Sequence, residues 1–271
     1  MDSRIAANRA NWDERARIHV RNTTGFYGIE RLKAGGCTLH AIEVEEVGDV
    51  RGKRLLHLQC HFGLDTLSWA RRGADATGLD FSAPAVEAAR DLARTTGLPA
   101  RFVQADVYDA RDAVTGAFDV VFTSWGALCW LPDMTRWAAV AAACLTPGGI
   151  LYAADGHPAL LQCEQEGDAL VPRYDWQTPI DRPQVFEDAT TYTGDPTPLT
   201  ATRTYEWFHP PVAVAQAMID AGLVVELVRE HEVLPWPAFP LMVAAETEGL
   251  YRLPPGHPRL PLSYSIRARK P

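Results

Sequence analysis

The sequence predicts an α/β fold, a doubly wound sheet of seven strands in which the last strand is antiparallel. The first observation is that short apolar runs alternate with amphipathic helical segments across residues 51–154, as in successive strand–helix–strand units. The second is that a helix and two further strands follow residue 209. The third is the period-two alternation over 262–268, which is typical of an antiparallel strand with one wetter face.

Five strands are expected in the first part of this pattern, and each is bounded by helix signals. Ser82 and Asp133 are expected to cap the helices that follow the second and fourth strands, while Gly73 and Gly97 end helices. The run from Phe118 reads as a buried parallel strand because it is continuously apolar and β-rich. The five predicted strands span residues 54–58, 74–79, 101–104, 118–123 and 150–154.

Two regions depart from the alternation. Residues 1–50 are polar and helical in pieces, at 11–15 and 39–47, and precede the main domain of residues 51–271. Residues 157–209 are rich in proline and aromatic residues, and the runs 184–193 and 199–207 within them could pair as a hairpin. An insert at this point would sit above the carboxyl edge of the sheet. We interpret it as a substrate cap, and a structural decoration is the alternative.

Composition excludes several classes of protein. The 271 residues suffice for one large α/β domain with additions, and a formal net charge of −8 disfavours nucleic acid as a partner. No apolar run approaches the roughly 18 residues that cross a bilayer, and no signal peptide precedes the domain, so a cytoplasmic protein is expected. Five cysteines without a C-x-x-C pair predict neither disulfides nor zinc. His57 and His61 are four residues apart, but on a strand and turn, so no metal site is predicted.

Polar residues follow the first three strands, where open α/β sheets bind ligands. The turn Gln59–Gly63 leads into a helix whose N-terminus offers free N–H groups, and Gly63 would allow close backbone approach of a ligand. Asp80 could accept both hydroxyls of a ribose, and Asp106 could accept from an adenine amino group, with Val107 offering backbone groups to the ring. Alternatively, Asp80 caps a turn and Asp106 caps the short helix it precedes. One adenosine-type ligand would explain the whole ordered set.

A dinucleotide ligand would require G-x-G-x-x-G after the first strand. Gln59 and His61 stand where the first two glycines would fall, and such side chains hinder the approach of a pyrophosphate. S-adenosylmethionine (SAM) carries no phosphate and tolerates this turn better. A nicotinamide-dependent oxidoreductase therefore remains the less favoured alternative.

The segments 55–67 and 77–82 resemble motif I and the following acidic motif of class I SAM-dependent methyltransferases, specifically the ubiquinone/menaquinone-type small-molecule branch with a HLQCHFGLDTLSWA motif I. Segments 105–107, 118–121 and 145–149 resemble the later motifs, so the resemblance covers roughly residues 50–155. It implies a Rossmann-like fold, SAM as cofactor, and methyl transfer to an O or N atom of a small-molecule acceptor such as a secondary metabolite. A SAM-binding protein that transfers no methyl group, pericyclase-like or structural, is the alternative.

The residues that this resemblance and the strand ends assign to the cofactor come from five segments. They are Tyr27, Gln59, Cys60, His61, Gly63, Asp80, Phe81, Ser82, Asp106, Val107, Ser124 and Trp125. In this family an N-terminal lid often closes over the cofactor, which implies a lid in residues 1–50 with Trp12, His19 and Tyr27. Two departures stand out: only Gly63 remains of the glycine-rich turn, and His57 replaces the usual acidic residue.

The acceptor side is expected after strands four and five. Trp125 or Trp130 could stabilise a sulfonium by a cation–π contact, or could simply pack. His157 is the first candidate for a general base and His209 the second, although a loop histidine is also often only a hydrogen-bond partner. The sequence does not identify the acceptor or the oligomeric state.

Overall fold

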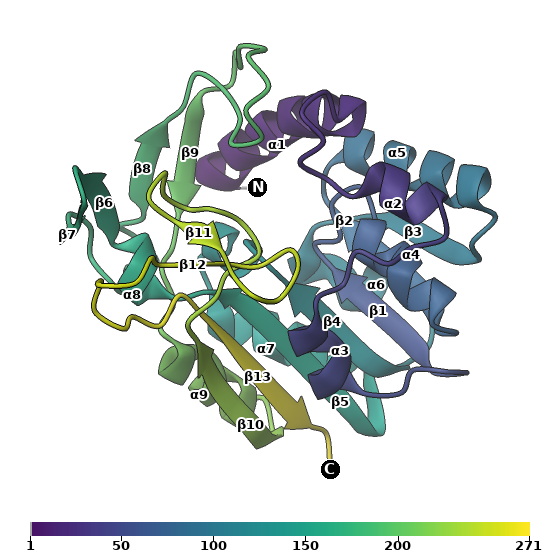
Figure 1. The fold of residues 1–271 in the computed structure, drawn as a ribbon. Coiled ribbons are helices and arrows are strands. Elements are labelled where there is room, and N and C mark those ends of the chain that lie inside the picture. Colours follow the sequence, from purple (N-terminus) through teal and green to yellow (C-terminus); the bar gives the residue numbers. More distant parts are fainter. Residues whose placement is uncertain (1) are drawn as a thin grey trace.

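A computed structural model describes residues 2–271 and contains the predicted seven-stranded sheet, in the order β10-β13-β5-β4-β1-β2-β3 (Figure 1). β1 to β5 are parallel, and β13 runs antiparallel between β5 and β10. The strand order reverses beside β1, so β1 and β4 flank the switch point where such sheets bind ligands. The strands are β1 (Arg54–Leu58), β2 (Asp75–Asp80), β3 (Ala100–Gln104), β4 (Phe118–Ser124), β5 (Leu145–Gly156), β10 (Val224–His231) and β13 (Ser263–Arg269).

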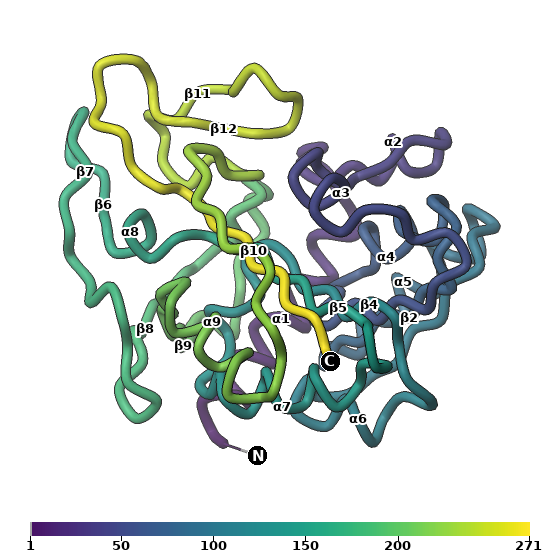
Figure 2. The backbone as a smooth tube through the Cα atoms, turned by 90° about the horizontal axis from the view of Figure 1, so that it is seen from below, coloured from purple at the N-terminus to yellow at the C-terminus, as the bar shows by residue number. Residues whose placement is uncertain are grey.

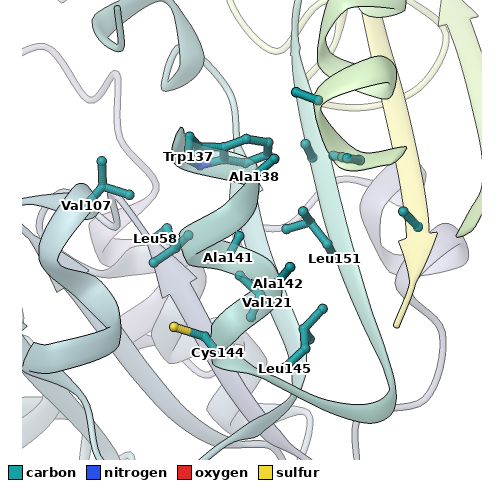
Figure 3. Close-up of a cluster of buried hydrophobic side chains, with 14 of the residues drawn as sticks. Leu58, Val107, Val121, Trp137, Ala138, Ala141, Ala142, Cys144, Leu145 and Leu151 are labelled. Atoms are coloured by element: carbon teal, nitrogen blue, oxygen red, sulfur yellow. The ribbon is translucent and has the colours of Figure 1, made fainter. Parts of the chain in front are cut away.

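Helices cover both faces of the sheet. On one face, α7 (Met134–Cys144) presents an apolar stripe, and Trp137, Ala138 and Ala141 pack on the sheet beside Val121 and Leu151 (Figure 3). The short α6 (Ala110–Ala113) and α9 (Pro211–Asp220) belong to the same core. The opposite face is covered by α3 (Ala41–Val47), α4 (Leu64–Arg71) and α5 (Ala83–Thr96). Both faces are therefore buried, as a parallel sheet requires.

The predicted helix caps are present. The Ser82 hydroxyl accepts from the Ala85 N–H at 3.4 Å and begins α5, and Asp133 accepts from the Arg136 N–H at 2.9 Å and begins α7. Gly97, in the left-handed region, ends α5.

The expectation of a wetter face on the last strand is wrong. Ser263 and Ser265 of β13 are fully buried, because β13 lies between β5 and β10 and not at the sheet edge. Their hydroxyls are satisfied internally: Ser263 Oγ donates to Val233 O at 2.6 Å, and Ser265 Oγ lies 2.9 Å from His231 Nε2. The serines of this strand are therefore buried and hydrogen-bonded within the protein, and they do not face solvent.

The N-terminal segment and the insert meet above the sheet. α1 (Ser3–Arg21) is one long helix that extends well beyond the predicted piece, and α2 (Ile29–Lys33) follows it. Within the insert, β8 (Gln184–Glu187) and β9 (Arg203–Glu206) form the predicted antiparallel pair, but each strand is short. α1 lies between this hairpin and α5 (Figure 1), and Figure 2 shows the insert on the opposite side of the molecule from α4 and α5.

Further short elements flank the sheet, and of these only the short helix after Asp106 was expected from the sequence. These are 3₁₀ turns η1 (Val107–Asp109) and η2 (Leu128–Trp130), α8 (Pro158–Leu161), and the strand pairs β6 (Cys163–Glu166) with β7 (Ala169–Pro172) and β11 (Val243–Ala244) with β12 (Tyr251–Arg252). Within residues 2–271, no helix has the length and apolar character needed to span a membrane.

Candidate functional site

The turn after β1 has an unusual backbone. Gln59 and His61 have positive φ angles of 55° and 50°, and Gly63, the N-cap of α4, has 81°. Non-glycine residues rarely adopt this left-handed region, and such strain concentrates at functional sites. The turn therefore achieves its tight geometry without the glycines of a phosphate-binding loop.

Asp80, at the end of β2, holds this turn in place. Its Oδ2 accepts the His61 N–H at 2.8 Å and its Oδ1 accepts the Ser82 N–H at 2.9 Å. The side chain is almost completely buried, and burial raises the pKa of Asp80 to about 6. An ionised carboxylate has about four acceptor sites, so each oxygen keeps one for a ligand hydroxyl. Asp80 therefore does cap the turn, as the alternative stated, and it still has acceptor sites for the ribose hydroxyls.

Packing within the protein gives a second reason for a glycine at position 63, beside the expected approach of a ligand. A Cβ at Gly63 would lie 2.6 Å from Phe102 Cε1 and 3.0 Å from Ala89 Cβ, so β3 and α5 pack directly against it. Cys60 is also a packing residue: it is buried, and its Sγ would lie 2.7 Å from a Cβ at Gly78. Any contact that Cys60 and Gly63 make with a ligand falls to their backbone.

The residues after β2 and β3 carry structural hydrogen bonds of their own. Asp106 is partly exposed, and its Oδ1 accepts from the Tyr108 N–H at 2.9 Å, so the capping alternative is present. The Val107 side chain belongs to the core. Ser82 donates its hydroxyl to Asp13 of α1 at 2.6 Å, and the Phe81 carbonyl accepts from Gln104 at 3.4 Å. Ser82 therefore connects α5 with the N-terminal helix.

Three buried polar atoms at the ends of β1 and β4 have no hydrogen-bond partner among the described residues: Gln59 Oε1, Thr123 Oγ1 and Ser124 Oγ. Gln59 and Ser124 each lie two residues beyond the paired His57 and Phe122, so they end neighbouring strands. Buried polar groups are almost always satisfied, and orphans need an explanation. A polar ligand at the switch point would supply the missing partners.

An aromatic and histidine cluster closes over the turn. His61 Nε2 lies 3.0 Å from His19 Nδ1. The Tyr27 hydroxyl lies 3.1 Å from His19 Nδ1 and 2.5 Å from the Tyr192 hydroxyl. Burial lowers the pKa of His19 to about 3 and that of His61 well below its usual value, so both rings are neutral. Trp12 packs edge-on against His61 with the ring centroids 5.3 Å apart. The structure thus gathers all three residues expected in the lid.

The two tryptophans predicted near the acceptor have different surroundings. Trp125 donates its indole N–H to Glu43 of α3 at 3.1 Å and packs against the core on the α3 side of the sheet. Its backbone has a positive φ of 53°. Trp130 donates to Gly126 O at 2.8 Å and meets Trp12 edge-on, with the centroids 5.2 Å apart. The ring beneath α1 is therefore Trp130, and the position of Trp125 favours its packing role.

The two candidate bases, His157 and His209, differ in how many of their ring nitrogens already have a partner. His157 caps α8, where Nδ1 accepts from the Ala159 N–H at 3.0 Å and Nε2 lies 3.3 Å from Glu230. His209 donates from Nε2 to Leu131 O at 2.7 Å, which leaves Nδ1 as an acceptor. Burial lowers the pKa of His209 to about 4, so it is neutral at pH 7. Both base roles remain predictions; of the two histidines, only His209 keeps a ring nitrogen without a partner among the described residues.

Two acidic residues in this region were not predicted from the sequence. Asp155, the penultimate residue of β5, accepts four backbone N–H groups, from Gly126, Ala127, Leu128 and Gly156, at 2.6–3.0 Å. Its position directly after the fifth predicted strand was the signal for it. Glu206, on β9 of the insert, has no local sequence signal, because only the fold brings it to the sheet edge.

A pocket of about 480 Å³ opens on the outer surface between α1, α2 and α5. Its lining includes Arg17, Lys33 and Glu87, and none of the residues predicted to bind the cofactor. In the part of the chain that the structure describes, no group of three or more His, Cys, Asp or Glu side chains is arranged to hold a metal ion.

Comparison with known proteins points to one enzyme class. Residues 56–151 match the family described as a methyltransferase domain. The ubiquinone biosynthesis O-methyltransferases of Photorhabdus laumondii and Pectobacterium atrosepticum are 33% and 37% identical over 109 and 101 residues. These matches cover 40% and 37% of this chain and 45% and 42% of the relatives, so the chain aligns with less than half the length of either.

Solved structures extend the likeness over most of the chain. An S-adenosylmethionine-dependent methyltransferase from Mesorhizobium loti has a TM-score of 0.56 at 19% identity, covering 85% of this chain and 98% of that one. A glycopeptide N-methyltransferase solved with S-adenosylmethionine has a TM-score of 0.52 at 16% identity, covering 84% and 85%. The chain therefore has the Rossmann-like fold of these methyltransferases.

Proposed function

We propose that this protein is a SAM-dependent methyltransferase that acts on an O or N atom of a small-molecule acceptor. The observation that carries the proposal is Asp80 at the end of β2, whose two oxygens each keep one acceptor site, together with the orphaned polar atoms that end β1 and β4. The match of residues 56–151 to methyltransferase domains and the O-methyltransferase relatives support the same conclusion.

The residues present fit SAM better than a dinucleotide. Asp80 would hold the ribose hydroxyls, Asp106 and the Val107 backbone the adenine, and Gln59 and Ser124 the polar methionine end. His57 is buried and bonded to Thr66 at 2.9 Å, and burial lowers its pKa to about 3, so this position offers no negative charge. When bound, SAM supplies a methyl group already activated by its sulfonium.

The chain then has to orient the acceptor and exclude water. We assign the exclusion of water to a lid in residues 1–50, in which His19 and Tyr27 meet Tyr192 of the insert above the turn. Residues 157–209 would cap the acceptor, because Trp207 N donates to Cys129 O at 2.7 Å and so fixes the insert to the loop after β4. His209, or His157 after release from its cap, remains a candidate to take a proton from the acceptor.

Calorimetry with S-adenosylhomocysteine (SAH), together with transfer of tritiated methyl from SAM to a panel of phenols, alcohols and amines, tests this function. We expect SAH binding in the micromolar range and methylation of at least one class of acceptor. SAH binding without turnover across the panel would favour a SAM-binding protein that transfers no methyl group. Binding of NADH in place of SAH would identify an oxidoreductase instead.

A further inference from the structure

The inner face of β9 carries two polar side chains that the proposed cofactor site does not use. Side chains alternate along a strand, so Thr204 and Glu206 share one face and Arg203 and Tyr205 the other. Thr204 is fully buried and Glu206 half-buried, whereas Arg203 is exposed. The face with Thr204 and Glu206 therefore points into the protein.

Hydrogen bonds on both sides of Glu206 fix its position. Asn8 of α1 accepts from the Tyr205 N–H at 2.8 Å and donates to Tyr205 O at 2.7 Å. On the other side, the Trp207 N–H donates to Cys129 O in the segment after β4. Glu206 is thus held between the lid helix and the segment that follows Ser124, on the side of the switch point where an acceptor would approach.

The titratable groups around Glu206 come from five neighbouring segments. Arg15 of α1 is the cation, Asp188 follows β8, Asp155 lies near the end of β5, and the Cys129 thiol and Tyr174 hydroxyl complete the set. Burial raises the pKa of Glu206 to about 7, Arg15 opposes this rise, and Asp188 and Asp155 add to it.

The polar atoms on this face lack partners. Within residues 2–271 no hydrogen bond reaches the Glu206 carboxylate, and Thr204 Oγ1 is buried without a partner. The half-buried Glu206 carboxylate therefore has oxygens free to accept a hydrogen bond or a proton from a ligand.

Arg15 connects Glu206 with the aromatic rings of the lid. Its guanidinium lies 5.8 Å from the ring centroid of Trp12 and 5.6 Å from that of Tyr192, and Trp12 in turn contacts His61 of the β1 turn. A series of contacts therefore links the cofactor turn, through the rings of His61 and Trp12 and the Arg15 guanidinium, with the surroundings of Glu206. An acceptor lying on these rings could present its polar group to the carboxylate.

We propose that Glu206 is the proton acceptor for a hydroxyl-bearing methyl acceptor, held between the inner face of β9 and Trp12; this inference rests on the proposed methyltransferase function. The acceptor O–H bond breaks and its proton passes to a Glu206 oxygen. The electron pair left on the acceptor oxygen forms the new O–CH₃ bond, while the pair of the broken S–CH₃ bond stays on sulfur. A carboxylate that titrates near the working pH suits this task, since catalytic bases work best there. A neutral amine would need no such base.

Glu206→Gln tests this role directly, with Glu187→Gln as the matched control. Glu187 is an exposed glutamate of the same hairpin that pairs with Arg203 on the outer face. The assay is tritiated methyl transfer from SAM to catechol between pH 6 and 9. We expect Glu206→Gln to lower kcat by about 100-fold or more with SAH affinity unchanged, and Glu187→Gln to change neither quantity.

The pH profile distinguishes a base from a structural residue. Wild-type kcat should rise as pH passes through about 7, where Glu206 loses its proton, and then level off; Glu206→Gln should lack this step. Glu206→Asp keeps the carboxylate and should recover part of the rate.

A Glu206→Gln protein with wild-type kcat and the wild-type pH step would overturn the assignment. So would wild-type protein that binds SAH and methylates amines but leaves catechol and other phenols unmethylated. Failure of the wild-type protein to bind SAH is a separate result, because it removes the proposed function itself.

Discussion

Asp80 and Asp155 are both buried carboxylates at the carboxyl ends of strands of the same sheet, and both anchor the loop of a neighbouring strand. Asp80 receives two backbone N–H bonds, one on each oxygen, and so keeps two acceptor sites. Asp155 receives four, two on each oxygen, and keeps none. The difference shows that a carboxylate at a strand end binds ligand only if the backbone leaves its lone pairs free.

The carboxyl edge of the sheet differs in the same way between the β1–β2 side and the β5 side. After β1 and β2 the turns are held by the Asp80 carboxylate, which can still accept hydrogen bonds from a ligand. The buried Gln59 Oε1 after β1 has no hydrogen-bond partner among the described residues. At β5 the carboxylate is consumed in fixing residues 126–128, so acceptor chemistry there has to come from the insert. We therefore assign Asp80 to the ligand and Asp155 to the scaffold.

Asp80→Asn should have the largest effect, a loss of SAH affinity of about 100-fold or more, because two charge-assisted hydrogen bonds to ribose become one neutral bond. Calorimetry of the folded variant measures it. Asp75→Asn, at the exposed start of the same strand, is the control and should bind SAH as the wild type does. Undiminished binding by Asp80→Asn would remove the ribose assignment.

Asp155→Asn should lower the free energy of unfolding by about 3 kcal/mol, since an amide nitrogen would face backbone N–H donors in a buried site. Urea unfolding monitored by tryptophan fluorescence measures this change. SAH affinity of the folded fraction should stay near wild type. If the variant kept its stability and lost SAH affinity as Asp80→Asn does, the contrast between the two carboxylates would fail.

Gly63→Ala should cost about 2 kcal/mol, because the new Cβ meets Phe102 and the residue keeps a positive φ. Gly126→Ala is the matched control: its φ is 71°, but nothing lies within 4 Å of the new Cβ, so only backbone strain remains. Thermal unfolding of both variants separates packing from strain. Equal losses would show that Phe102 yields and that the glycine is needed for its φ alone.

His157→Ala should have the smallest effect, about 1 kcal/mol from the lost cap of α8, with kcat within a factor of about three of wild type. Methyl transfer and urea unfolding, measured on the same preparation, check both parts. A fall in kcat of about 100-fold with little loss of stability would restore His157 as the base.

The parts of the fold that follow from local pattern could be predicted. β1, the start of α5 at Ser82 and the stripe of α7 follow from residue type and periodicity within a dozen positions. The buried polar face of β13 could not be predicted, because its neighbours on both sides come from distant parts of the chain.

The candidate site divides along the same line. Asp80 could be located because it follows a strand at the switch point, but the number of N–H groups on each carboxylate depends on where loops from other strands end. The packing role of Gly63 could not be predicted, since Phe102 is far from it in sequence. Glu206 could not be found, because its role depends on α1 and the segment after β4 meeting β9.

A crystal structure of the complex with SAH tests the central claim most directly. We predict that the ribose hydroxyls bind the Asp80 oxygens, that the adenine lies beside Asp106, and that the methionine end reaches Gln59 and Ser124. SAH bound instead in the outer pocket between α1, α2 and α5, with Asp80 contacting only His61 and Ser82, would contradict the account.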